Sequence, residues 1–247
     1  MTRAPTRVGT AGWSIPRAAA AAFPSEGSGL ERYAAVFNAV EIDSTFYRSH
    51  RAQTFERWRA ATPSAFRFAV KAPRAITHEA RLIGCEALLA GFFDETAPLA
   101  EKLGPILIQL PPSLRFEPRM ARSFFAGLRK VWPRAVVFEP RHLSWFGQEA
   151  TQLLSAFQIS CVAADPPIGG NGAPAPGASI AYWRLHGSPR VYYSDYGPEA
   201  LAALREEIDA HPAPERWCIF DNTASGAATA NALTLMDEID RTTGTAA

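Results

Sequence analysis

Short apolar runs rich in β-branched and aromatic residues recur along this chain. Most are followed by a segment with the 3.6-residue spacing of an amphipathic helix. Glycine, proline, asparagine and serine separate the two kinds of segment, as is typical of turns. We predict strands at 6–13, 39–43, 66–71, 105–110, 135–139, 159–165, 179–185 and 216–221. We predict helices at 30–38, 52–61, within 85–103, and at 118–131, 148–157, 198–210 and 225–239.

Eight strands with a helix in nearly every interval predict an α/β fold, a (β/α)8 TIM-type barrel that residues 1–247 form as a single domain. The alternative is an open, doubly wound sheet, which is disfavoured because no G-x-G-x-x-G motif follows the first strand. The rhythm breaks at about 166–178, where a Pro/Gly-rich stretch has no helical period. We expect this stretch to be either a flexible lid or a tolerated insertion.

Alternation along the strands predicts which side chains face the interior of the barrel. Val40 and Ile42 fall on one face of their strand, and Glu41 and Asp43 on the other. If the apolar faces meet the helices, the lumen holds Glu41, Asp43, Arg67, Lys71, Glu139 and Arg184. Isolated ions there would each cost several kcal/mol, so they must pair. The network then either fixes the register of the barrel or serves a function.

Composition narrows the classes of partner. A net charge of +1 at pH 7 creates no overall attraction to nucleic acid or to a membrane. The three cysteines are far apart and form no C-x-x-C pair, which indicates a reducing compartment. We recognise no signal peptide and no apolar run of membrane-spanning length. We therefore expect a cytoplasmic protein with no membrane partner.

Ionisable groups at strand ends are the candidate catalytic residues. The apolar strand at 135–139 ends in Glu139, which is the strongest candidate for acid/base chemistry, alone or paired with Glu41. His186 is the second acid/base candidate. Lys71 could form a Schiff base, as barrel lysines do in aldolases, although the acids nearby favour its charged form.

A metal site and a nucleophile are the alternatives. Glu139, His142, Asp165, His186 and Asp221 are ligand types found in barrels such as xylose isomerase and endonuclease IV, so a metal-dependent hydrolase or isomerase stays open. The chain has no H-x-H or H-E-x-x-H motif, and cationic side chains on the same face would repel a metal ion. We expect neither a metal nor a cofactor. No G-x-S-x-G motif is present, and no cysteine lies at a strand end.

Basic and aromatic residues around the strand ends suit a small anionic ligand, or a nucleic acid. The candidate ligand-binding residues are Tyr47, Arg48, Arg141, His142, Trp145, Arg184, Arg190, Asn222, Ser225 and Gly226. Ser225 and Gly226 lie where the last helix should begin, and free amides there would form an anion site together with Arg190.

Several motifs resemble the YecE-like family, also called domain of unknown function 72. They are GTAGW at 9–13, VEIDSTFY at 40–47, FAVK at 68–71, QLPP at 109–112, EPRH at 139–142, RLHG at 184–187 and DNT at 221–223. The resemblance implies a TIM-barrel fold and no particular reaction, because the activity of the family is unsettled. Asp221 departs from the family's pattern, in which asparagine is usual, and it adds a carboxylate to the rim.

We therefore expect an enzyme that uses general acid/base chemistry on a small anionic ligand, phosphorylated or sugar-like, bound at the C-terminal face of the barrel. The alternative is a non-catalytic barrel that binds a ligand or a nucleic acid.

Overall fold

A computed structural model describes residues 6–169, 172, 174 and 179–244. The strands are β1 (Arg7–Thr10), β2 (Ala39–Ile42), β3 (Arg67–Lys71), β4 (Leu103–Gln109), β5 (Val136–Glu139), β6 (Ser160–Cys161), β7 (Ala163–Asp165), β8 (Ile180–Leu185) and β9 (Glu215–Phe220). The helices are α1 (Gly29–Ala34), α2 (Ala52–Ala60), α3 (Glu86–Thr96), α4 (Pro118–Val131), α5 (Gln148–Ala156), α6 (Pro198–Ala210) and α7 (Ala227–Gly244).

The strands form two parallel sheets, in the orders β2-β3-β4-β5-β6 and β1-β9-β8-β7. All eight predicted strands are present, but the sixth is interrupted at Val162, and its halves β6 and β7 belong to different sheets. An isolated parallel bridge joins Ala11, just beyond β1, to Glu41 of β2. β1 also approaches β2 closely at Gly9, where any side chain would collide with the carbonyl group of Ala39. The chain is thus an α/β fold with parallel sheets.

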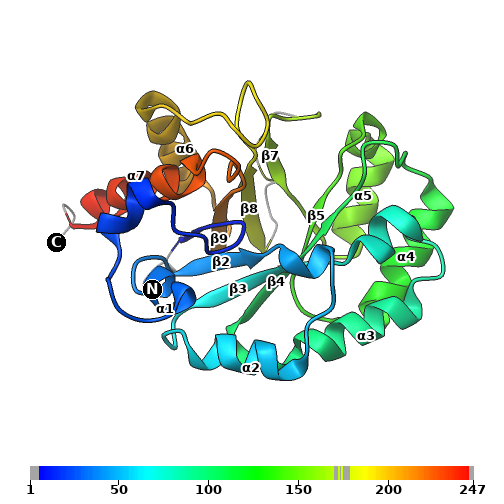
Figure 1. Cartoon of the computed structure of the whole chain (residues 1–247). Coiled ribbons are helices and arrows are strands. Elements are labelled where there is room, and N and C mark those ends of the chain that lie inside the picture. The colour runs from blue at the N-terminus through cyan, green and yellow to red at the C-terminus, as the bar shows by residue number, and fades with distance from the viewer. Residues whose placement is uncertain (1–5, 170–171, 173, 175–178, 245–247) are drawn as a thin grey trace.

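The predicted alternation of the strands is confirmed. Val40, Ile42, Phe68 and Val70 are buried in the large core between the sheets and the helices. Their neighbours in sequence face a smaller core made of Ala39, Ala69, Leu107, Val137, Val162, Ile180, Tyr182, Trp217 and Ile219. Figure 1 shows α2 to α5 along the outside of the first sheet and α6 and α7 beside the second. Full burial of one large apolar side chain contributes about 1.5–3 kcal/mol, so the two cores account for much of the driving force for folding.

Helix boundaries follow their capping residues. The carboxylate of Glu117 accepts the backbone N–H groups of Arg119 and Met120, and Pro118 occupies the first turn, so α4 begins where we predicted. Ser28 and Glu31 form a capping box at the start of α1. That helix ends at Ala34, four residues earlier than predicted.

The predicted lid at 166–178 lies partly outside the described residues. Within the described part, Gly169 lies against Phe146 and Leu143, where a β-carbon would come within 2.8 Å of the Phe146 ring. Among the helices that the structure describes, none is both long and apolar enough to cross a membrane.

Candidate functional site

Arg184, the next-to-last residue of β8, is the centre of an ionic cluster at the C-terminal ends of the strands. Its side chain is fully buried. Its guanidinium lies 2.8 Å from a carboxylate oxygen of Glu41 on β2, 3.3 Å from Glu139 on β5 and 3.0 Å from Asp221 after β9. One planar, permanently charged group therefore ties together three acids from three strands.

His186 follows two residues after Arg184 and lies between two of the same acids. Its Nε2 is 2.8 Å from Glu139 Oε1, and its Nδ1 is 2.9 Å from Asp221 Oδ2. Burial favours the neutral ring, but the charge of Glu139 and the hydrogen bonds to both acids raise the pKa of His186. Each ring nitrogen faces an acceptor, so the geometry fits an imidazolium that donates in both directions.

The two acids that flank His186 are held ionised. Burial alone would raise the pKa of Glu139, but the charges of His186 and Arg184 outweigh it and hold that pKa well below its usual range. Burial opposes ionisation of Asp221 in the same way, and Arg184 and His186 lower its pKa. We name the set Glu41, Glu139, Arg184 and His186 the buried layer.

Less buried groups lie around this layer and form ion pairs with it or with one another. Lys71 Nζ is 2.7 Å from Asp43 Oδ1 and 4.4 Å from the centre of the Phe46 ring. Arg141 lies 3.3 Å from Glu139 Oε1. The exposed fractions of the side chains are 8% for Lys71, 29% for Asp43, 13% for Arg141 and 10% for Asp221.

Tyr192 lies next to these groups. It adopts a left-handed backbone conformation with φ of 70°, and its ring centre is 5.8 Å from that of His186. Burial and the charge of Asp221 raise the pKa of Tyr192, so the hydroxyl stays protonated and can donate a hydrogen bond. We name the set Asp43, Lys71, Arg141, Tyr192 and Asp221 the outer layer.

Two tyrosines also belong to this site. Tyr192 belongs to a tyrosine pair after the end of β8, and that position was its only sequence signal. Tyr182 donates from its hydroxyl to Glu41 Oε2 at 2.8 Å. It shares a strand face with Arg184 and His186, as the alternation along this strand predicts.

Two expected positions are corrected by the structure, and a third has a local structural partner. Arg67 lies at the opposite end of β3 from Lys71 and donates to the backbone carbonyls of Ser64 and Phe66, so it takes no part in the ionic cluster. Trp145 is only 1% exposed, and its indole N–H donates to the carbonyl of Leu114, so it is a core residue. His142 Nδ1 accepts the backbone N–H of Ser144 and caps a short 3-10 helix.

The residues expected to bind an anion near the last helix have other partners. α7 begins at Ala227, and the N–H of Gly226 donates to Thr223 while the N–H of Ala228 donates to Asn222. Ser225 donates its hydroxyl proton to the carbonyl of Tyr193. Two of the amides that we expected to be free are therefore engaged within the turn.

Of the remaining candidate ligand-binding residues, one is buried and the others are exposed. Asn222 is buried and its amide donates to Ser194 and Asn231, which holds the loop after β8 against α7. Arg190 is exposed and lies 3.9 Å from the ring centre of Tyr193. Tyr47 and Arg48 are also exposed, after β2.

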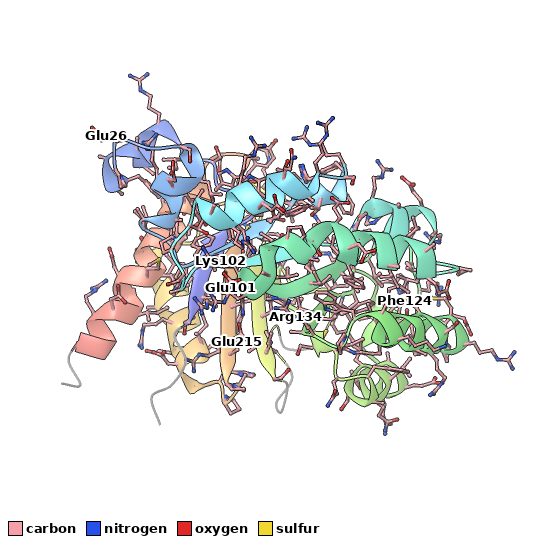
Figure 2. The ribbon with its side chains drawn as sticks, turned by 90° about the horizontal axis from the view of Figure 1, so that it is seen from below. Glu26, Glu101, Lys102, Phe124, Arg134 and Glu215 are labelled. Carbon is pink, nitrogen blue, oxygen red and sulfur yellow. The ribbon has the colours of Figure 1, made fainter. Side chains whose placement is uncertain are left out.

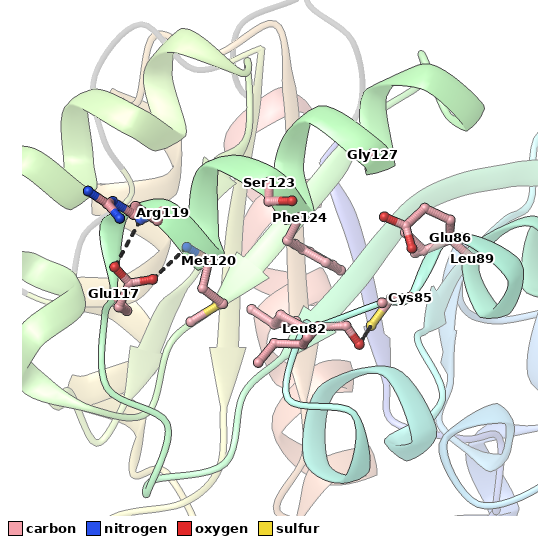
Figure 3. Close-up of a pocket in the computed structure, with 12 residues that line it drawn as sticks. Leu82, Cys85, Glu86, Leu89, Glu117, Arg119, Met120, Ser123, Phe124 and Gly127 are labelled. Atoms are coloured by element: carbon pink, nitrogen blue, oxygen red, sulfur yellow. Dashed lines mark hydrogen bonds between the residues drawn. The ribbon is translucent and has the colours of Figure 1, made fainter.

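The metal alternative meets a geometric obstacle. The guanidinium of Arg184 already lies between Glu139 and Asp221, where a metal ion would have to bind both acids. Within the part of the chain that the structure describes, no three His, Cys, Asp or Glu side chains are arranged to hold a metal ion. A cleft of about 340 Å³ lies elsewhere, between α3 and α4 (Figure 3). None of our candidate residues lines that cleft, so the candidate site is the ionic cluster.

Comparison with known proteins agrees with this architecture. The sequence profile of the family described as "Protein of unknown function DUF72" matches residues 7–246. UPF0759 protein YecE of Escherichia coli K12 is 37% identical over 112 residues, which span 45% of this chain and 39% of that protein. UPF0759 protein YunF of Bacillus subtilis 168 is 22% identical over 243 residues, 85% of this chain and 86% of that protein.

Two solved structures share the fold. A DUF72 family protein from Thermotoga maritima MSB8 superposes with a TM-score of 0.79 at 27% identity, covering 95% of this chain and 99% of that one. A DUF72 family protein from Enterococcus faecalis V583 also gives a TM-score of 0.79, at 22% identity, covering 96% of each chain.

Proposed function

This chain belongs to the DUF72 family, whose description names no activity, and we propose from its geometry that it is an enzyme acting by general acid/base chemistry on a small anionic ligand, phosphorylated or sugar-like. The ligand binds at the C-terminal ends of the strands, against the outer layer. The single observation that carries the proposal is the two-layer arrangement of charges, in which a fully paired buried layer supports partly exposed ions.

The roles of the two layers follow from which polar atoms already have hydrogen-bond partners within the site. Both oxygens of Glu41 and of Glu139 accept hydrogen bonds from side chains of the site, and both nitrogens of His186 face carboxylates. These three residues, together with Arg184, are therefore assigned to holding and orienting charge. Our expectation that Glu139, His186 and Glu41 exchange protons directly with a ligand is revised on this ground.

The outer layer supplies the groups that touch the ligand. Lys71 and Arg141 offer cationic donors for a phosphate or carboxylate. Asp221, whose pKa is lowered, is the candidate base, and Tyr192, whose pKa is raised, is the candidate acid. Asp221 therefore presents a carboxylate and Tyr192 a hydroxyl proton, which are the protonation states that a general base and a general acid need.

Ligand-dependent thermal stability tests the proposal. Wild-type protein is screened against inorganic phosphate, sugar phosphates, uncharged sugars and nucleotides. An anion that binds the folded state should raise the melting temperature, and the shift should grow with the logarithm of its concentration above the dissociation constant. Lys71→Gln and Arg141→Gln should each reduce the shift, whereas Lys130→Gln, on the exposed face of α4, should leave it unchanged. The absence of any anion-dependent shift in wild type would overturn the proposal.

Measuring whether the protein consumes its ligand distinguishes an enzyme from a non-catalytic binding protein. A ligand found in the screen should be consumed by the wild-type protein, and Asp221→Asn should slow its consumption by about 100-fold or more if Asp221 is the base. Binding without consumption would instead favour a barrel that only carries its ligand.

We also propose that the two sheets close into one (β/α)8 barrel. The bridge between Ala11 and Glu41 supports closure between β1 and β2, with the N–H of Gly12 donating to the carbonyl of Glu41 at 2.8 Å. On the other side, β6 and β7 are successive parts of one interrupted strand, and the N–H of Val162 donates to Phe138 on β5. An experimental structure with an open gap at either seam would contradict closure.

A further inference from the structure

A serine and a histidine outside the two charged layers are in hydrogen-bonding contact. Ser44 Oγ lies 2.8 Å from His50 Nε2. Ser44 begins the short 3-10 helix Ser44–Phe46, directly after β2 and next to Asp43 of the outer layer. Ser44 and His50 are both partly exposed residues. A nucleophile and a base at this distance are the basic requirement of covalent catalysis.

The position of His50 is fixed by two helices. On α3, Glu95 accepts the backbone N–H of His50 at 2.5 Å and the hydroxyl of Ser49 at 2.5 Å. On α2, the rings of Phe55 and Trp58 contact the imidazole edge to face, with ring centres at 5.8 Å and 5.1 Å. The imidazole is thus held toward Ser44 by packing that does not depend on the hydrogen bond itself.

The charge state of His50 suits a base. Burial and the positive charge of Arg48 lower the pKa of His50, which keeps the ring neutral at pH 7. A neutral ring can accept the hydroxyl proton of Ser44, whereas an imidazolium cannot. His186 in the buried layer has the opposite environment, because two carboxylates surround it.

A second serine–histidine pair shows what a purely structural contact looks like. Ser144 Oγ lies 2.8 Å from His142 Nδ1, but it also accepts the backbone N–H of Phe116. The same His142 nitrogen accepts the backbone N–H of Ser144, so both side chains are occupied by the main chain. The described residues offer the Ser44 hydroxyl no second hydrogen-bond partner beside His50.

We propose that Ser44 is a nucleophile activated by His50, and that the pair gives the protein an acyl-transfer activity toward carboxylic esters. Ser44 Oγ bonds to the acyl carbon while its proton passes to His50 Nε2. The bond from the acyl carbon to the alcohol oxygen breaks, and the alcohol leaves with that proton. Water then attacks the acyl-serine, gives one proton to His50, and releases the acid as the proton returns to Ser44 Oγ. This activity is independent of the acid/base function proposed for the outer layer.

A fluorophosphate probe tests the nucleophile without knowledge of the natural ester. Diisopropyl fluorophosphate forms an Oγ–P bond with an activated serine, the P–F bond breaks, fluoride leaves, and the proton is taken by the base. We expect one label on the wild-type protein, which peptide mass mapping places on Ser44. Ser44→Ala should remove that label, and His50→Gln should slow labelling by about 100-fold or more.

The control is Ser144→Ala, which removes the hydroxyl of the second pair and should be labelled at Ser44 at the wild-type rate. Circular dichroism and melting temperature establish that each variant is folded before its labelling is compared. Wild-type protein that is not labelled at Ser44, or a folded His50→Gln variant that is labelled at the wild-type rate, would overturn the proposal.

Discussion

The two ends of the strands hold their cations in different ways. At the N-terminal ends, side-chain cations donate to backbone carbonyls: Lys102 Nζ to Arg59 and Thr62 at 2.6 Å each, and Arg134 to Leu103 at 2.5 Å. At the C-terminal ends, Arg184, Lys71 and His186 are paired with carboxylates. Figure 2, which views the molecule from below, labels Lys102 and Arg134.

This difference distinguishes cations with a structural role from the cations of the candidate site. A carbonyl carries only a partial charge, and carbonyls at a helix end are unpaired, so the contact of Lys102 with the end of α2 is a helix cap. Removing such a cation leaves hydrogen bonds unmade but no opposite full charge in the interior. Removing a cation from the buried layer leaves carboxylates buried and uncompensated. The two ends should therefore respond differently to the same kind of substitution.

The largest effect is expected from Arg184→Leu. The change leaves Glu41, Glu139 and Asp221 without their shared cation and should cost about 3–5 kcal/mol of unfolding free energy, or prevent folding. Urea denaturation followed by circular dichroism measures the cost. A loss below about 1 kcal/mol, the range of exposed ion pairs, would show that the buried layer is not a coupled network.

A smaller effect is expected at the other end, from Lys102→Met. Methionine keeps the length of the side chain but cannot donate to Arg59 and Thr62, which should cost about 1–3 kcal/mol. The same urea experiment measures it. A loss as large as that of Arg184→Leu would remove the distinction between the two ends.

The buried charges at the C-terminal ends of the strands should make the stability of the protein depend on pH. The raised pKa of His186 contributes stability that is complete below its unfolded value of 6.5 and is lost as pH rises through the folded pKa. The lowered pKa values of Glu139 and Asp221 contribute stability that is complete above their unfolded values of 4.5 and 3.8 and is lost as pH falls. Together, these groups predict that the unfolding free energy is largest between pH 4.5 and pH 6.5.

Unfolding free energies measured across this range and on both sides of it check the prediction. The Lys102→Met variant is the matched control, because Lys102 touches none of these groups, and its stability should vary with pH as the wild-type stability does. Stability that rises steadily above 6.5 would contradict the assignment of His186.

The smallest effect is expected from Asp165→Asn. Asp165 at the end of β7 is partly exposed and accepts the hydroxyl of Tyr196 at 2.5 Å. Asparagine keeps an oxygen acceptor at this position, so the loss should stay below about 1 kcal/mol. A loss comparable to that of Arg184→Leu would mean that β7 carries part of the buried layer.

The strands, and the faces on which their side chains lie, could be predicted from the sequence because alternation is a local property. The sequence placed Arg184 in the interior and made Glu41 and Glu139 expected partners. It did not separate Arg67 from Lys71, because alternation fixes the face of a strand but not which end of it meets the network. The sequence also did not show that Trp145 packs into the core, because an aromatic residue in a loop gives the same sequence pattern whether it is buried or exposed.

Contacts between residues distant in sequence were beyond prediction. Asp221 was noticed as an unusual carboxylate at the rim, but its contacts with Arg184 and His186 depend on how β9 sits beside β8. Ser44 and His50 are close in sequence, but the loop that brings them together is held by Glu95, which is 45 residues beyond His50. Neither leaves a spacing motif in the sequence.

The claim that the buried layer holds charge while the outer layer meets the ligand is tested most directly at His186. Nitrogen-15 NMR of histidine-labelled protein reports whether each ring nitrogen carries a proton. We predict that both nitrogens of His186 are protonated at pH 7, because Glu139 and Asp221 each accept one of the two N–H groups. A neutral ring at that pH would contradict the account and would return His186 to the groups that can exchange protons with a ligand.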